Sequence, residues 1–316
     1  MITTKPLTRP ASLNEWRTRG AKHDPVFKES LEFGMAYLAQ PTDLFISPYS
    51  KCGTTWLQQI VHCLRTRGNM DFDDLIQVIP WLEIVQLLGI DPYAPQCGGF
   101  RVFKSHLSYY AIPKGGRYIV SFRDPKDALV SLYHFCNGYS WADGAVSLAE
   151  FARAIYLDKQ ESKFLSGYWE HLVSWWEQFY TPNVLLLSYE EMKADLPATI
   201  QMIADFLGLE LDEELLTLAV KQASLDFMLA HKPKFSAWLY QEALAKLDFI
   251  PPSDTFTMVK TGRIGDHRTE LPTDISAEMD VRWHEEVETR VGISSYQALR
   301  ETLVLERGLS NATNLK

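Results

Sequence analysis

The sequence predicts an α/β fold, a single domain with a mostly parallel central sheet flanked by helices. Two observations predict it. Short apolar runs rich in Val, Ile, Leu, Phe and Tyr do not alternate with polar residues, which is typical of strands buried on both faces of a parallel sheet. Segments with helical periodicity fill the gaps between these runs, and alternating strands and helices indicate a doubly wound arrangement. The predicted strands are Leu44–Ser47, Val102–Lys104, Tyr118–Phe122 and Val184–Ser188, and the predicted helices include Thr55–Thr66, Pro125–Cys136, Gly167–Tyr180 and Ala198–Leu207.

The order of these elements suggests one domain over residues 31–307. Residues 1–30 are polar, and we expect them to form an irregular or partly helical lead-in. Residues 232–271 contain Pro and Gly with weak periodicity, so we expect a long loop that folds back over the site. A helical pattern returns from 275 to 307, and residues 308–316 form a polar tail.

Composition narrows the class of protein. The 316 residues carry 31 basic and 40 acidic side chains, a formal charge of −9, so nucleic acid and anionic membranes are poor candidates as partners. No apolar run approaches the roughly 18 residues of a membrane span, and the N-terminal segment lacks the apolar core of a secretory signal. The four cysteines, Cys52, Cys63, Cys97 and Cys136, form no CxxC pair, which argues against a zinc site or a disulfide framework. We expect a cytoplasmic, reduced protein without a metal.

A phosphate-binding loop is predicted after the first strand, where the sequence reads SPYSKCGTTW. A loop that enters a helix offers unpaired N–H groups and the positive end of the helix dipole. Gly53 allows close approach of the backbone, Thr54 and Thr55 add hydroxyls, and Lys51 adds a charge. The loop is P-loop-like but is not a Walker A motif, because its lysine precedes the glycine. The alternative is an ordinary strand–turn–helix with an exposed lysine.

A second anion site is predicted after the third strand. Arg123 lies at the carboxyl end of this strand, where it can grip a phosphate with two hydrogen bonds. Asp124 suits the N-cap of the following helix and Pro125 suits its first position. Alternatively, Arg123 pairs with an acid such as Asp127.

Five segments in order resemble motifs of the cytosolic-type sulfotransferase family, which uses 3′-phosphoadenosine 5′-phosphosulfate (PAPS). Lys51–Trp56 resembles the family's 5′-phosphosulfate loop, and Phe103–Leu107 is similar to its catalytic Lys-Thr-His-Leu segment. Arg117–Phe135 resembles its 3′-phosphate strand and helix. Trp175–Met192 resembles a later helix and a strand that ends in a tyrosine, and Lys260–Asp266 resembles the family's Gly-Asp loop.

The resemblance implies transfer of a sulfuryl group from PAPS to a hydroxyl or amine, with adenosine 3′,5′-bisphosphate as the second product. By this resemblance, Lys51 neutralises charge on the bridging oxygen, Lys104 contacts the sulfuryl oxygens and His106 is the general base. Imidazole suits that role near neutral pH. A sulfuryl group carries one negative charge fewer than a phosphoryl group, so we expect no metal requirement.

The resemblance also implies a set of residues that bind the nucleotide. The 5′-phosphate would be held by the loop Lys51, Cys52, Gly53, Thr54 and Thr55. Adenine would contact Trp56, Tyr189, Ser224 and Leu225. The 3′-phosphate would be held by Arg123, Ser131, Lys260, Thr261, Gly262 and Arg263.

Several positions depart from the family pattern. The usual serine after the lysine is Cys52, and a thiol at a helix N-terminus beside a lysine can have a lowered pKa, so we hypothesise that Cys52 is sensitive to oxidation. The usual lysine before the glycine is Thr261, which weakens the 3′-phosphate assignment there, although Arg263 could compensate, and the usual tryptophan after Gly-Asp is His267. The dimer segment of the family is poorly matched in 268–278, so a homodimer is possible but not established.

The acceptor is expected to be a small molecule, an alcohol, phenol or amine, in an apolar pocket opposite the nucleotide. Candidate lining residues are Tyr109, Phe135, Tyr139, Trp141, Trp238 and Tyr240, each of which could instead be packed in the core.

Two rival functions remain: a P-loop-like nucleotide kinase, which would need a lysine after the glycine and a magnesium-binding acid, and a non-catalytic nucleotide-binding protein.

Overall fold

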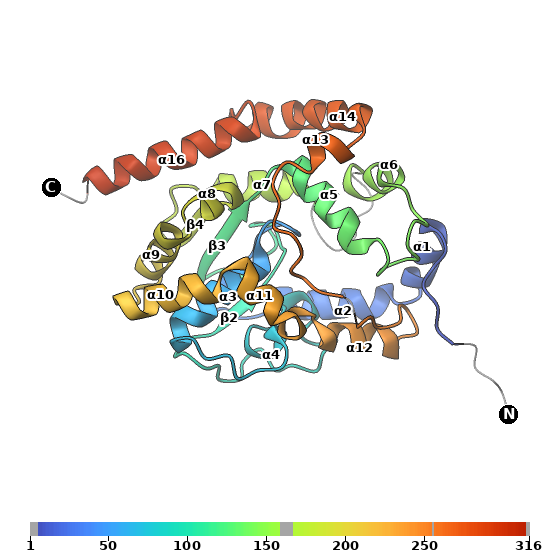
Figure 1. Cartoon of the computed structure of the whole chain (residues 1–316), viewed down its shortest axis with the longest axis horizontal. Coiled ribbons are helices and arrows are strands. Elements are labelled where there is room, and N and C mark those ends of the chain that lie inside the picture. Colours follow the sequence, from blue (N-terminus) through green and yellow to red (C-terminus); the bar gives the residue numbers. More distant parts are fainter. Residues whose placement is uncertain (1–5, 159–166, 255, 314–316) are drawn as a thin grey trace.

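The central sheet has four parallel strands, as predicted. In the computed structural model, which describes residues 6–158, 167–254 and 256–313, the strands lie in the order β2-β1-β3-β4 (Figure 1). Each neighbouring pair is parallel, so the carboxyl ends of all four strands meet at one edge of the sheet. The strands are β1 (Leu44–Ile46), β2 (Val102–Lys104), β3 (Arg117–Phe122) and β4 (Val184–Ser188).

Alternation of side chains along β1 divides the apolar core between the two faces of the sheet. Leu44 and Ile46 belong to a cluster with α3 (Thr54–Thr66), α9 (Leu196–Leu207) and α10 (Glu213–Gln222). Phe45 belongs to the opposite cluster, which includes Trp175 of α7 (Tyr168–Trp176) and reaches α14 and α16. Because both faces are covered, β1 can be entirely apolar.

The predicted helices form, with shifts at some ends. Pro125–Cys136 is α5 as predicted, whereas the helix predicted for 167–180 ends at Trp176. Asp124 caps α5, since its side chain accepts a hydrogen bond from the Lys126 N–H at 2.8 Å. The remaining elements are α1 (Leu13–Ala21), α2 (Asp24–Met35), α4 (Leu75–Val78), η1 (Leu82–Ile84), α6 (Leu148–Phe151), η2 (Ala152–Tyr156), α8 (Tyr189–Ala194), α11 (Leu225–Ala230), η3 (Lys232–Phe235), α12 (Trp238–Lys246), α13 (His267–Glu270), α14 (Thr273–Trp283), η4 (His284–Glu288), α15 (Thr289–Val291) and α16 (Tyr296–Thr313).

Two segments differ from the expectation. The loop predicted for 232–271 contains α12, which forms because Leu244 packs with Phe249 and Ile250 in a third apolar cluster, although its own helical pattern is weak. The described residues between α12 and α13, 247–254 and 256–266, form no helix or strand (Figure 1). The C-terminal helical region is broken between α15 and α16, where Gly292 adopts a φ of 73°.

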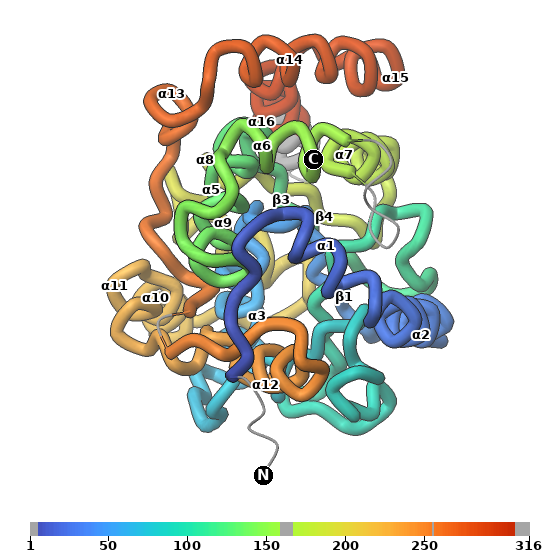
Figure 2. The backbone as a smooth tube through the Cα atoms, turned by 90° about the vertical axis from the view of Figure 1, so that its right-hand side faces the viewer, coloured from blue at the N-terminus to red at the C-terminus, as the bar shows by residue number. Residues whose placement is uncertain are grey.

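The N-terminal segment packs against the body of the domain (Figure 2). Leu13 is buried, and Arg9 donates a hydrogen bond from Nε to the Tyr139 carbonyl at 3.1 Å. Arg17 donates to the Ala154 carbonyl at 2.8 Å. The expected lead-in is therefore helical and contributes to the core. Among the described residues, no helix has the length and apolar character needed to cross a membrane.

We predict that Gly34→Ala destabilises the fold although it replaces a helical glycine. Helix propensity alone favours alanine by about 1 kcal/mol. A Cβ at Gly34, however, would lie 2.3 Å from the Leu82 carbonyl oxygen, so α2 and η1 must separate, and overpacking of this kind costs about 1–3 kcal/mol. Urea unfolding should give a lower midpoint with an unchanged slope.

Gly20→Ala in α1 is the matched control for this substitution. Its Cβ would lie 3.5 Å from Phe249, an ordinary contact, so helix propensity should dominate and the midpoint should rise. Equal gains for both variants would contradict the close packing of α2 on η1.

Candidate active site

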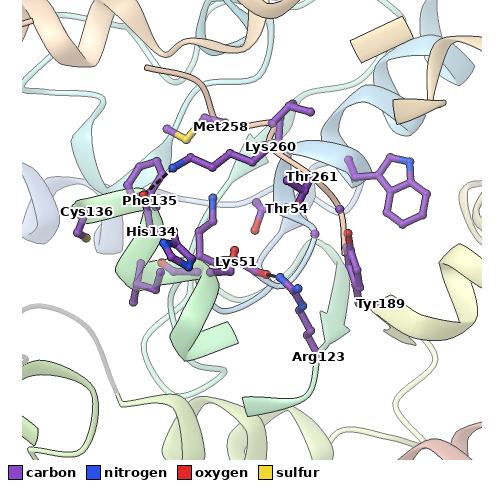
Figure 3. A pocket seen from close by; sticks show the side chains of 18 of the residues that line it. Lys51, Thr54, Arg123, His134, Phe135, Cys136, Tyr189, Met258, Lys260 and Thr261 are labelled. Atoms are coloured by element: carbon purple, nitrogen blue, oxygen red, sulfur yellow. Dashed lines mark hydrogen bonds between the residues drawn. The ribbon is translucent and has the colours of Figure 1, made fainter. Parts of the chain in front are cut away.

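A cavity of about 780 Å³ lies beyond the carboxyl ends of the strands. Each strand contributes residues at or just after its end: Lys51 after β1, Lys104 in β2, Arg123 after β3 and Tyr189 after β4. Lys51, Arg123 and Tyr189 lie around it together with Lys260 of the segment 256–266 (Figure 3). The register of the sheet therefore brings together basic side chains that are far apart in the sequence.

The loop after β1 forms a cradle at the start of α3. Lys51 and Gly53 both have positive φ, 66° and 94°, which turn the chain tightly before the helix. A Cβ at Gly53 would lie 3.1 Å from the Tyr189 ring, so glycine suits both the conformation and the space. Thr54 Oγ1 is buried and has no hydrogen-bond partner, although Thr54 lines the cavity. Orphaned donors and the free N–H groups of the helix start fit an anionic group.

Arg123 links the two predicted phosphate-binding segments. Its guanidinium donates to the Lys51 carbonyl at 3.0 Å and to the Arg263 carbonyl at 2.8 Å, and it lies 4.7 Å from the centre of the Tyr189 ring. Its Nε is buried without a partner. The alternative pairing with Asp127 is not what this geometry shows, because the Asp127 carboxylate accepts its hydrogen bonds from the loop before α13.

Asp127, on α5, holds this loop in place, a role that sequence reasoning missed. Its carboxylate accepts from the Gly265 N–H at 2.7 Å, from the His267 N–H at 3.2 Å and from His267 Nδ1 at 2.8 Å. Burial alone would raise the pKa of Asp127, but these hydrogen bonds outweigh it and the pKa is lowered. His267, where the family pattern has tryptophan, thus joins the 260–266 segment to α5.

His106 is held as a neutral imidazole. Its Nδ1 lies 2.7 Å from the Pro48 carbonyl oxygen, which can only accept, so Nδ1 carries the proton and Nε2 is the basic atom. Burial, together with the Lys104 cation, lowers the pKa of His106 well below its usual range. The backbone N–H of His106 donates to Glu83 at 2.6 Å, which fixes the segment. Trp81 covers Lys104 and His106, since its ring lies 3.6 Å from Lys104 Nζ and 5.4 Å from the His106 ring.

Two lysines in the cavity, Lys51 and Lys104, have a lowered pKa. Burial, and then the cations of Lys260 and Arg123, lower the pKa of Lys51 to about 7. Burial lowers the pKa of Lys104 to about 8, against the opposing effect of Glu83. Lys51 Nζ lies 4.5 Å from the centre of the Phe135 ring. An anion in this cavity would favour the protonated forms of these lysines.

The other predicted nucleotide-binding residues also line the cavity. Trp56 is fixed by a hydrogen bond from Nε1 to the Ala223 carbonyl at 2.8 Å, and its ring lies 5.6 Å from that of Tyr189. Ser224 caps α11 through its Oγ. Gly262 has a φ of 59°, and its carbonyl accepts from Lys193, a cavity residue that was not predicted. The remaining predicted residues found there are Thr55, Ser131, Leu225, Lys260, Thr261 and Arg263.

The prediction of a lowered Cys52 pKa is wrong. Cys52 is 1% exposed and does not line the cavity. Burial raises the pKa of its thiol to about 12, and the nearby Arg123 cation does not overcome this effect. The physical basis for an oxidation-sensitive Cys52 is therefore absent.

The structure places only half of the predicted acceptor-site residues in the cavity. Phe135, Tyr139 and Tyr240 line it. The other three lie elsewhere. Tyr109 packs on Trp175 with ring centres 5.3 Å apart, and Trp141 is fully buried against Trp16. Trp238 and Tyr240 are both on α12, and residues two positions apart in a helix project about 200° apart. Of these two, Tyr240 faces the cavity and Trp238 does not.

Several lining residues were not predicted, because they come from segments without a motif. They are Trp16, Trp81, Leu244, Phe249, Ile250 and Met258. Among the residues that the structure describes, no group of three His, Cys, Asp or Glu side chains is placed to hold a metal ion.

Comparison with known proteins gives the family. The profile of the sulfotransferase domain matches residues 41–290. The chain is similar to amine sulfotransferase of Oryctolagus cuniculus, with 28% identity over 78% of this chain and 80% of that protein, and to sulfotransferase 2A6 of Rattus norvegicus, with 30% identity over 73% and 79%. The chain belongs to the sulfotransferase family.

Solved structures share the fold. Retinol dehydratase in complex with retinol and PAP superposes with a TM-score of 0.66 at 19% identity, covering 84% of this chain and 86% of that chain. Mouse sulfotransferase SULT7A1 complexed with PAP gives 0.63 at 20% identity, covering 89% and 94%.

We predict that Asp127→Asn weakens binding of adenosine 3′,5′-bisphosphate. An amide cannot accept all the hydrogen bonds that the carboxylate receives from Gly265 and His267, so the loop carrying Lys260 and Arg263 should loosen. We expect the dissociation constant measured by calorimetry to rise about tenfold, equivalent to about 1.4 kcal/mol. Asp280→Asn, which removes an exposed partner of Lys126, is the control. Tighter binding by D127N would mean that charge repulsion outweighs positioning.

We also predict that affinity for the bisphosphate falls as pH rises from 7 to 9. The phosphates are fully ionised in this range, since their second pKa is about 6. Lys51, with a pKa lowered to about 7, must regain a proton when the anion binds, so affinity should fall by up to about tenfold per pH unit until the pKa of the complex is reached.

Lys51→Met should reduce this pH dependence, whereas Lys126→Met should keep it, because Lys126 does not line the cavity and pairs with Asp280. A wild-type affinity that is flat over this range would contradict the lowered pKa of Lys51.

Proposed function

We propose that this chain transfers the sulfuryl group of PAPS to a hydroxyl of a small aromatic acceptor, through Lys51, Lys104 and His106. The observation that carries the proposal is the neutral His106, with Nε2 as its basic atom, in one cavity with two cationic subsites. Family membership supplies the reaction class, and PAPS is the sulfuryl donor.

The residues present fit such a nucleotide. The orphaned Thr54 hydroxyl, the Gly53 turn and the start of α3 would hold the 5′-phosphate. Arg123, with its unpartnered Nε, and Ser131 would hold the 3′-phosphate together with the segment from Lys260 to Arg263. Trp56 and Tyr189, whose rings meet edge to face, would hold the adenine, with Ser224 and Leu225 beside them.

The side chains divide the chemistry of the transfer. When bound, PAPS supplies an activated sulfuryl group for in-line displacement, a class of reaction in which positioning and charge stabilisation dominate. His106 Nε2 takes the proton of the acceptor hydroxyl. Lys51 stabilises negative charge that grows on the leaving oxygen, and Lys104 contacts the sulfuryl oxygens. Glu83 and Pro48 hold His106 in the orientation that this proton transfer needs.

The charge distribution favours a neutral acceptor over an ammonium ion. Three carboxylates line the cavity, and each already has a partner near the 260–270 segment: Asp127 with His267, Asp266 with Arg263 and Glu270 with His134. The wall near His106 is formed instead by aromatic rings such as Trp81 and Tyr240, whose centres lie 5.4 Å apart. We therefore propose a phenol or aromatic alcohol, although a similar relative is named an amine sulfotransferase.

Three broader expectations stay predictions. Scattered cysteines and the resemblance to cytosolic-type sulfotransferases support a cytoplasmic location. The division into residues 1–30, 31–307 and 308–316 and the possible homodimer follow from the same sequence reasoning.

The nucleotide preference is tested by thermal shift with adenosine 3′,5′-bisphosphate, AMP and ATP, each with and without magnesium. Saturation at about 100 times the dissociation constant stabilises a fold by about 2.7 kcal/mol, a shift of a few degrees for a chain of this length. We expect the bisphosphate to act without magnesium. A magnesium-dependent shift with ATP alone would favour the kinase instead.

We predict that His106→Ala lowers turnover of a phenol such as 2-naphthol by about 10²–10⁴-fold, because general-base catalysis is lost. Affinity for the bisphosphate should remain within about twofold of the wild type, which separates this variant from a misfolded one. His284→Ala, at an exposed position, should leave both quantities unchanged. Wild-type turnover by H106A would remove the base assignment.

A further inference from the structure

We propose that the Tyr139 hydroxyl is a hydrogen-bond donor that selects acceptors carrying a second oxygen, a carbonyl or hydroxyl, in addition to the hydroxyl that reacts. The inference deepens the proposed function and rests on it. Tyr139 lies just beyond the end of α5 and lines the cavity.

The Tyr139 ring is held firmly. Its backbone N–H donates to the Cys136 carbonyl at 3.1 Å, and its own carbonyl accepts from Arg9 Nε at 3.1 Å. The ring lies against Phe256, with centres 3.9 Å apart, and near Phe135 at 6.2 Å. The hydroxyl therefore has a fixed position, so little conformational freedom is lost when it donates to a ligand.

This hydroxyl is buried and has no partner. Tyr139 is 5% exposed, and its hydroxyl oxygen makes no hydrogen bond within the described part of the chain. Most buried polar side-chain atoms in proteins are paired, so an orphan in the wall of a cavity indicates a partner inside the cavity. Burial, and then the proximity of Tyr240, raise the pKa of Tyr139, so the group stays protonated and acts as a donor.

An aromatic wall connects the reacting centre to Tyr139. Trp81 lies 5.4 Å from the His106 ring, and Tyr240 lies 5.4 Å from Trp81 on the other side. Tyr240 also lies near enough to Tyr139 to raise the pKa of its hydroxyl. An aromatic acceptor lying along this wall would place its reacting hydroxyl at His106 and a second oxygen at Tyr139.

The chemistry of the partner follows from what surrounds the hydroxyl. The groups near it among the described residues are Tyr240, the Arg9 cation, Cys136 and the rings of Phe135 and Phe256, and none of these is a carboxylate or a strong acceptor. A group that accepts from a phenol in an apolar setting is a carbonyl or hydroxyl oxygen. A site built to donate such a bond discriminates against analogues that lack the acceptor, because the donor is then left unpaired.

The experiment compares Tyr139→Phe with the wild type on two acceptors, 2-naphthol and 6-acetyl-2-naphthol. Affinity is measured by tryptophan fluorescence in the presence of saturating adenosine 3′,5′-bisphosphate, so binding is read without turnover. We expect Y139F to weaken binding of the acetyl compound about tenfold and to leave 2-naphthol within about twofold. Because the hydroxyl has no hydrogen-bond partner among the described residues, Y139F should fold like the wild type. Tyr109→Phe, outside the cavity, is the matched control and should change neither affinity.

The outcomes separate this inference from the proposed function. Equal losses for both naphthols would show a structural role for Tyr139, and unchanged affinity for both would show that the hydroxyl contacts no ligand; either result overturns the inference. Failure of the wild type to sulfate any phenol would overturn the proposed function, while the binding difference would still decide the role of Tyr139.

Discussion

Burial of like charges is the constraint on which this site depends. The register of four parallel strands brings Lys51, Lys104 and Arg123 to one cavity, where the other two cations disfavour the charge of Lys51. The fold tolerates this arrangement because Arg123 is tied to two backbone carbonyls and Lys104 has Glu83 and Asp74 behind it. No hydrogen bond or carboxylate within the described part of the chain supports the Lys51 ammonium, so its charge depends most strongly on what occupies the cavity. A bound anion and the protonation of Lys51 therefore stabilise each other.

The same cavity contains a base that burial keeps neutral. Burial and the nearby Lys104 cation act on His106 in the same direction, away from the imidazolium form. The Pro48 carbonyl then decides which nitrogen carries the proton. The group that accepts the proton and the groups that stabilise negative charge thus share one environment, and the cations that bind the donor nucleotide also keep the base available.

Sequence reasoning reached the parts of the molecule whose residues carry a local signal. The strands, α5 with its Asp124 cap, and the loop from Lys51 to Thr55 could be predicted because turn chemistry and apolar runs are encoded locally. Asp127 and Glu83 could not, because their roles follow from partners more than twenty residues away. Trp141 and Tyr240 are both aromatic residues near motifs, and only the packing of α1 and α12 decides that one is core and the other faces the cavity. The Cys52 interpretation failed because proximity to a lysine was weighed without the depth of burial.

The hydrogen bond from Arg9 to the Tyr139 carbonyl bears on the order in which the parts of the site assemble. Arg9 also donates to the Pro252 carbonyl, so one side chain near the start of the described chain joins segments that are 130 and 243 residues further along. The cradle after β1 needs only the first two hundred residues or so, since Tyr189 is the last strand-end residue that packs against Gly53. During synthesis on the ribosome, the 5′-phosphate cradle can therefore assemble before Tyr240 and Phe249 of the acceptor wall are made, whereas the 3′-phosphate residues Lys260 to Arg263 follow both. The nascent protein thus begins its donor site before its acceptor wall and completes it afterwards.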